Sequence, residues 1–140
     1  MNTERPLVYI VDDSADYRFF VSQVFKRFLT QYRVQYFESG TALCAHLGIE
    51  PLDLPCLILM DHRMPGLNGP QTLTYLRQHP GWQTVPTVIM SSSTSHEDQQ
   101  EALQAGASRY LVKPVAFVSL KEQLTLLCEY WSAVSYSQPD

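Results

Sequence analysis

The chain alternates short apolar runs with amphipathic segments of helical spacing, five times in succession. The apolar runs cover residues 7–11, 34–37, 56–60, 87–90 and 109–112. The segments with helical spacing or helix-capping signals cover residues 15–30, 39–47, 70–79, 97–105 and 116–132. Strands that are apolar throughout and alternate with helices form parallel sheets covered on both faces. We therefore predict an α/β protein built from five βα units.

The length and charge of the chain fit one such domain and exclude several classes of protein. A chain of 140 residues is the usual size of a single domain. Its net charge of −4 gives no basic surface for nucleic acid. No apolar run approaches the roughly 18 residues of a membrane span, and the N-terminus has no signal-peptide core. We expect a cytoplasmic protein that binds neither nucleic acid nor membranes.

The cysteines and histidines do not predict a disulfide framework or a zinc site. The cysteines are Cys44, Cys56 and Cys128, and the histidines are His46, His62, His79 and His96. Neither set has the short, regular spacing that metal ligands or disulfide-rich domains show. We expect buried thiols and surface imidazoles.

Polar residues that could take part in catalysis or ligand binding follow the predicted strands. Asp12 and Asp13 follow the first strand and Asp61 the third, while Ser91 and Lys113 follow the fourth and fifth. Open parallel sheets bind ligands beyond the carboxyl ends of their strands. If the first and third strands are neighbours, three carboxylates converge, and their repulsion requires a cation. A site of oxygen ligands alone suits Mg²⁺.

These side chains together match the needs of a phosphoryl group. A metal ion, an ammonium group and a hydroxyl group can surround its three equatorial oxygens. An aspartate in that setting can act as the nucleophile and form an acyl phosphate. A single aspartate after a strand is most often a helix cap, but four such elements at successive strand ends rarely coincide by chance.

The chain resembles the receiver domain of response regulators, the CheY-like family. The matching stretches are residues 11–13, residues 57–69 with their D-x-x-M-P-x-x-x-G pattern, residues 86–92, residues 105–107 and residues 110–114. The resemblance implies a flavodoxin-like (βα)5 three-layer sandwich with a five-stranded parallel sheet in the order 2-1-3-4-5. It divides the chain into an N-terminal lead (1–6), a receiver domain (7–128) and a C-terminal helix end and tail (129–140), with no output domain.

The resemblance also implies a role for each acidic residue. Asp61 is the phosphoacceptor. Asp13 and Asp61 bind Mg²⁺ directly, and the main-chain carbonyl of Arg63 is the third protein ligand. Asp12 acts mainly through a metal-bound water. The Arg63 side chain, two residues after the phosphoacceptor, either shields the acyl phosphate or lies in solvent, and the sequence leaves both possibilities open.

Three further residues take switching roles by resemblance. Ser91 is the switch hydroxyl that turns toward the phosphoryl group. Tyr110 is the switch aromatic residue that rotates inward. Lys113 pairs with the phosphoryl oxygens. The sequence departs from the commonest pattern after Ser91, where Ser92 stands in place of the usual Ala or Gly. By the same resemblance, Ser93 and Arg63 flank the path of the attacking water.

The implied function is that of a two-component response regulator. It accepts a phosphoryl group from a histidine kinase phosphohistidine onto Asp61 and switches its protein contacts, catalysing only its own phosphorylation and dephosphorylation. One alternative is a phosphorelay intermediate that passes the group onward. Two others are an aspartyl-nucleophile phosphatase, whose DxD motif is missing after the first strand, and a scaffold independent of phosphorylation, which the intact site residues disfavour.

Two partners are expected beyond the general class of sensor histidine kinases. Residues 77–86 and the serine-rich stretch after the fourth strand are similar to single-domain receivers associated with bacterial phytochromes. The other partner is a second copy of the chain. Receivers of this kind often dimerise through the fourth helix, fifth strand and fifth helix, and the C-terminal tail with Tyr130, Val134 and Tyr136 would dock on the partner. An apolar stripe in the last helix, expected to face the sheet, comprises Leu120, Leu124, Leu127 and Trp131.

Overall fold

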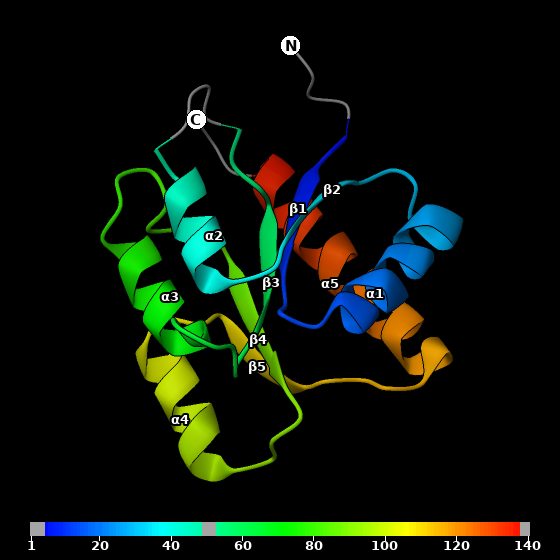
Figure 1. The fold of residues 1–140 in the computed structure, drawn as a ribbon. Coiled ribbons are helices and arrows are strands. Elements are labelled where there is room, and N and C mark those ends of the chain that lie inside the picture. The colour runs from blue at the N-terminus through cyan, green and yellow to red at the C-terminus, as the bar shows by residue number, and fades with distance from the viewer. Residues whose placement is uncertain (1–4, 49–52, 138–140) are drawn as a thin grey trace.

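The computed structural model describes residues 5–48 and 53–137, which contain five strands and five helices in alternation (Figure 1). The strands are β1 (Leu7–Val11), β2 (Arg33–Phe37), β3 (Leu57–Asp61), β4 (Thr87–Ser91) and β5 (Arg109–Val112). The helices are α1 (Ala15–Phe28), α2 (Gly40–His46), α3 (Gly69–Arg77), α4 (His96–Gln104) and α5 (Phe117–Ser137). Each predicted strand and helix is present. Residues 1–4 of the expected lead and 138–140 of the expected tail lie outside the described residues.

The strands form one parallel sheet in the order β2-β1-β3-β4-β5, which confirms the predicted flavodoxin-like topology. β1 lies between β2 and β3, and Val11 at its end is opposite Phe37 on one side and Met60 on the other. The direction of winding changes between β1 and β3. The carboxyl ends of these two strands therefore meet at the position where open α/β sheets bind ligands.

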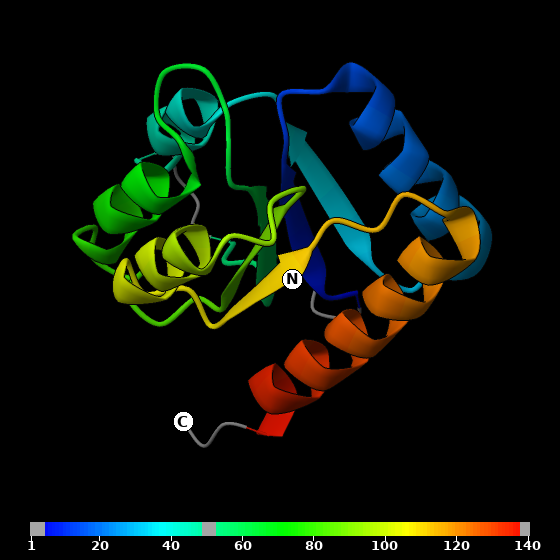
Figure 2. The same cartoon turned by 90° about the horizontal axis from the view of Figure 1, so that it is seen from below.

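Helices cover both faces of the sheet, as the apolar strands predict. Helices α1 and α5 lie on one face, and α2, α3 and α4 lie on the other (Figures 1 and 2). Two apolar clusters fill the two interfaces. One contains Val24 and Leu124 from α1 and α5, and the other contains Leu43 and Leu73 from α2 and α3. The three-layer sandwich holds the strand ends, and with them the site, in fixed positions.

Side-chain caps fix the starts of the four helices that follow β1 to β4. The cap residues Ser14, Ser39, Asn68 and Ser95 accept a hydrogen bond from the backbone three residues further on. Such caps stabilise a helix by about 1 kcal/mol each, because they satisfy an otherwise unpaired N–H group. They also fix the loops at the carboxyl edge of the sheet, where the predicted site residues lie.

The last helix is longer than the sequence analysis predicted. It continues to Ser137 rather than ending near Ser132, since no glycine or proline interrupts it before residue 138. The predicted stripe does face the sheet: Leu120, Leu124 and Leu127 are buried and Trp131 packs against the same cluster. Among the described residues, no helix combines the length and the apolarity that crossing a lipid bilayer requires.

Candidate functional site

Three carboxylates meet at the carboxyl ends of β1 and β3. Asp12 and Asp13 follow β1 directly, and Asp61 is the last residue of β3, the neighbouring parallel strand. One carboxylate oxygen from each of the three lies within 4.8 Å of the others. The structure thus brings together the acidic residues that the sequence singled out.

The backbone and side chain of Asp12 are both held in place. Its side chain is buried, and one carboxylate oxygen accepts a hydrogen bond of 2.9 Å from the Ser14 amide. Its carbonyl accepts a bond of 2.7 Å from the Arg18 guanidinium, and its amide donates to the carbonyl of Phe37. Asp13, by contrast, is exposed. The pocket therefore has a rigid inner carboxylate and an outer carboxylate open to solvent.

Lys113 supplies the positive charge in this pocket. Its ammonium nitrogen lies 2.7 Å from Asp12 Oδ2 and 3.6 Å from Asp61 Oδ1. The same nitrogen lies 4.1 Å from the ring centroid of Tyr17, whose hydroxyl donates to the carbonyl of Pro114 at 2.9 Å. A cation over an aromatic face is attracted by the ring quadrupole. The ammonium group is thereby fixed between two of the three carboxylates.

The pocket still carries excess negative charge. Burial first, and then the charge of Asp12, raise the pKa of Asp61 to about 6 against the opposing effect of Lys113. One lysine cannot neutralise three carboxylates within 4.8 Å of one another. A divalent cation with a preference for oxygen ligands fits this donor set and charge. The acidic cluster is therefore suited to a divalent metal ion.

Ser91 and Tyr110 contact the same residue from two sides. Ser91 is buried at the end of β4, and its hydroxyl accepts a hydrogen bond of 3.0 Å from the Ser93 amide. The hydroxyl of Tyr110, on β5, donates to the Ser93 carbonyl at 2.8 Å. The two predicted switch residues are thus linked through the loop between β4 and α4, not by direct contact.

The Arg63 side chain points toward α4. It is 71% exposed, and one guanidinium nitrogen lies 2.7 Å from a carboxylate oxygen of Asp98. A hydrogen bond with the Ser93 hydroxyl is the main reason why the pKa of Asp98 lies below its usual value, and Arg63 lowers this pKa as well. Of the two arrangements that the sequence left open, the structure shows the guanidinium at the surface, where it is held by an ion pair.

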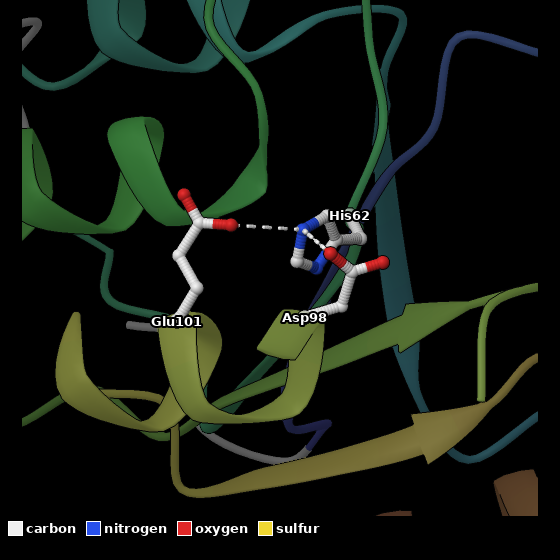
Figure 3. A group of neighbouring side chains, drawn as sticks. All are labelled: His62, Asp98 and Glu101. Atoms are coloured by element: carbon white, nitrogen blue, oxygen red, sulfur yellow. Dashed lines mark ion pairs between the residues drawn. The ribbon is translucent and has the colours of Figure 1, made fainter. Parts of the chain in front are cut away.

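His62 is a residue whose position the sequence analysis predicted wrongly. It was expected at the surface, but it is 2% exposed, and its Nε2 faces Asp98 and Glu101 of α4 (Figure 3). Side chains alternate between the two faces of a strand and its extension, so the residue after Asp61 turns toward the other side. The alternation of side chains along the strand was the sequence signal that could have predicted the burial of His62.

Two of the three cysteines, Cys56 and Cys128, are buried as expected, and Cys44 is partly buried.

The fold and the pocket define an α/β domain with a carboxylate and lysine site at the switch point of a flavodoxin-like sheet. The family model described as the response regulator receiver domain matches residues 8–125. The chain therefore belongs to the receiver family of two-component response regulators, as its sequence resemblance predicted.

Two plant response regulators illustrate the relationship in sequence. The chain is 33% identical over 110 residues to the two-component response regulator ORR5 of Oryza sativa, covering 79% of each chain. It is 34% identical over 122 residues to the two-component response regulator ARR7 of Arabidopsis thaliana, covering 81% of this chain and 58% of that one.

Solved structures share the fold at lower identity. The phosphorylated cyanobacterial phytochrome response regulator RcpA superposes with a TM-score of 0.82 at 19% identity, covering 93% of this chain and 96% of its own. A second solved structure is the receiver domain of the sensor histidine kinase PA1611 from Pseudomonas aeruginosa, with a magnesium ion in its active site cleft. It gives a TM-score of 0.75 at 22% identity, and the match covers 91% of this chain and 98% of that one.

Proposed function

We propose that the chain is a response regulator that accepts a phosphoryl group from the phosphohistidine of a sensor histidine kinase onto Asp61. The observation that carries the proposal is the position of the Asp61 carboxylate. It lies 3.6 Å from the ammonium nitrogen of Lys113 and belongs to the cluster of three carboxylates. Membership of the receiver family supports the same reaction. Phosphorylation would change the protein contacts of the chain.

The transfer needs little covalent chemistry from the protein. A carboxylate oxygen of Asp61 attacks the phosphorus atom, and the bond between phosphorus and the histidine nitrogen breaks, leaving its electron pair on the imidazole. An acyl phosphate forms on Asp61. Lys113 stabilises negative charge on the phosphoryl oxygens, and positioning and electrostatics supply most of the catalysis in such reactions. The chain would catalyse only its own phosphorylation and dephosphorylation.

The acidic cluster would hold Mg²⁺. The proposed ligands are Asp13, Asp61 and the main-chain carbonyl of Arg63, with Asp12 acting through a bound water. A hard divalent ion of this kind neutralises charge on carboxylates and phosphoryl oxygens alike. The raised pKa of Asp61, caused first by burial and then by the charge of Asp12, supports the proposal, because a bound cation would favour the ionised carboxylate.

The loop after β4 would carry the switch. The Ser91 hydroxyl accepts from the Ser93 amide at 3.0 Å, which leaves its own proton available for a phosphoryl oxygen. Tyr110 bonds to the Ser93 carbonyl, and its ring packs against the buried ring of His62. Rotation of either side chain away from Ser93 would release the loop, so the loop has a held and a released arrangement. A phosphoryl group that binds Ser91 would favour the arrangement in which the hydroxyl reaches it.

Two partners follow from this proposal. A bacterial phytochrome is the proposed kinase, supported by the shared fold with the phytochrome response regulator RcpA. A second copy of the chain is the other proposed partner, binding through α4, β5 and α5. Exposed apolar side chains on these elements support the dimer: Leu103 on α4, Val112 on β5, and Leu126 and Tyr130 on α5.

Labelling by acetyl phosphate with Mg²⁺ tests the phosphoacceptor. We expect the intact mass of the protein to rise by one phosphoryl group, and Asp61→Asn to abolish the rise, because an amide cannot be the nucleophile. Asp16→Asn, an equal change at an exposed aspartate of α1, is the matched control and should label normally. Undiminished labelling of Asp61→Asn would refute the assignment. Sustained turnover of a phosphomonoester would indicate an aspartyl phosphatase instead.

A further inference from the structure

A second group of metal-ligating side chains lies where the loop after β3 meets α4. His62 comes from the loop, and Asp98 and Glu101 come from α4 (Figure 3). Because the two acidic residues are three positions apart on a helix, they share one face of it. One ligand atom from each of the three residues lies within 4.8 Å of the others. None of the three belongs to the acidic cluster that is proposed to hold Mg²⁺.

The distances match the coordination shell of a small transition-metal ion. His62 Nε2 lies 3.4 Å from Glu101 Oε1 and 3.9 Å from Asp98 Oδ1. Zinc binds imidazole nitrogen and carboxylate oxygen at about 2.0–2.2 Å in a tetrahedral arrangement, which places its ligand atoms roughly 3.3–3.5 Å apart. The contact of His62 with Glu101 falls in this range, the contact with Asp98 exceeds it by a few tenths of an ångström, and the two carboxylates lie within 4.8 Å of each other.

The burial of His62 is a separate observation that points to a ligand. The residue is 2% exposed, and Figure 3 shows its ring turned toward the two carboxylates. Its Nε2 faces a carboxylate oxygen of Asp98 at 3.9 Å and one of Glu101 at 3.4 Å. The Nδ1 atom, which has no hydrogen-bond partner among the described residues, is not the proposed ligand atom. A nitrogen of a buried ring thus points at both carboxylates, as a metal ligand in this cluster would have to.

The surroundings of the cluster orient its ligands and leave a path for entry. Arg63 binds Oδ2 of Asp98 at 2.7 Å, which leaves Oδ1 directed at His62. Partners of this kind orient the ligands in metal sites. Glu101 is half-exposed, and an open pocket lined in part by Met64 and Gln71 reaches His62 and Glu101. An ion with a water molecule in the fourth position fits this opening.

We propose that His62 Nε2, Asp98 and Glu101 bind a divalent transition-metal ion of the zinc class. A mixed nitrogen and oxygen donor set favours such an ion over Mg²⁺, which prefers oxygen ligands alone. The bound ion would join α4 to the loop that follows Asp61. It would thereby oppose movement of α4, independently of phosphorylation.

Zinc titration of the full chain in excess Mg²⁺ tests the proposal. We expect one zinc ion per chain by isothermal titration calorimetry and a rise in melting temperature, because an ion that binds only the folded state stabilises it. Glu101→Gln removes one ligand with little change in shape and should weaken zinc binding at least tenfold. Glu97→Gln is the matched control, since it makes the same change at an exposed position of the same helix.

Two additional variants place the ion. His62→Gln should abolish the intense visible absorption that cobalt gives in a four-coordinate site with a nitrogen ligand, whereas Asp13→Asn should leave it unchanged. Loss of the signal in Asp13→Asn alone would place the ion in the acidic pocket and overturn the proposal. Absence of zinc binding by the wild-type chain would equally overturn it, leaving the cluster as a contact between the imidazole and the two carboxylates.

Discussion

The hydroxyl of Tyr110 donates a hydrogen bond to the main-chain carbonyl of Ser93 across 2.8 Å. This bond ties β5 to the loop between β4 and α4. The amide of the same serine donates to the Ser91 hydroxyl at 3.0 Å. One loop residue is therefore held by both proposed switch residues.

Removal of the Tyr110 hydroxyl should loosen this loop. We expect Tyr110→Phe to lower the free energy of unfolding by about 1 kcal/mol, the usual net contribution of one hydrogen bond. It should also increase hydrogen exchange at the amides of residues 93–95, since the Ser93 carbonyl loses its partner. Exchange can be followed by NMR before and after addition of acetyl phosphate with Mg²⁺.

Tyr75→Phe, on the exposed part of α3, is a control that should change neither the free energy of unfolding nor the exchange at residues 93–95. Unchanged exchange in Tyr110→Phe would mean that the bond does not hold the loop.

The pKa of Asp61 predicts a pH-dependent stability in metal-free protein. Burial, and then the charge of Asp12, raises it from 3.8 to about 6. The folded protein therefore binds this proton more tightly than the unfolded chain, and the free energy of unfolding falls as the pH rises from about 4 to about 6. Asn cannot ionise, so Asp61→Asn should be more stable than wild type above pH 6, by on the order of 3 kcal/mol.

Chemical denaturation at several pH values measures this difference. It should shrink toward zero below pH 4, where the wild-type carboxyl is protonated in both states. Excess Mg²⁺ should also reduce it above pH 6, since a bound cation favours the ionised form. A wild-type protein as stable as Asp61→Asn at pH 7 without metal would show that the pocket accommodates its charges unaided.

Mg²⁺ should stabilise the protein through the acidic pocket. The carboxylates of Asp12, Asp13 and Asp61 repel one another, and a divalent ion that binds the folded state relieves that repulsion. We expect the melting temperature to rise with Mg²⁺ and Asp13→Ala to remove the rise. Asp16→Ala, at an exposed neighbour in α1, should retain it. A full response in Asp13→Ala would locate the metal elsewhere.

Short-range patterns were sufficient to predict the fold and the acidic pocket. The five side chains of β1 are all buried, which is the arrangement that an uninterrupted apolar run predicts for a central strand. Asp12, Asp13 and Asp61 could be placed together because residues that follow neighbouring parallel strands share one edge of the sheet. These inferences need only local periodicity and the rules of sheet topology.

Local sequence patterns could not predict contacts between side chains that are far apart in the sequence. Arg77 donates hydrogen bonds to the carbonyls of Trp82, Val85 and Gly106, and so joins the end of α3 to two loops. The sequence placed Arg77 only within a helix predicted over residues 70–79. The cluster of His62 with α4 was missed for the same reason, because its partners are more than thirty residues away. The position of a long side chain depends on tertiary packing that no local rule specifies.

Dimerisation through α4, β5 and α5 is the last prediction. Leu126 and Tyr130 are exposed on α5 and line a pocket with Arg109 of β5, so they offer apolar area where a partner could bind. Because α5 continues through the segment expected to be a tail, truncation would cut the helix. Point substitutions therefore test the interface more directly.

We expect wild-type protein to show a dimer mass by light scattering, and acetyl phosphate with Mg²⁺ to increase the dimer fraction. Tyr130→Glu should shift the mass to that of a monomer, because it places charge in an apolar contact. Phe19→Glu, at an equally exposed site on α1, should leave the dimer intact. A monomer mass for the wild-type chain, with and without phosphorylation, would refute the dimer.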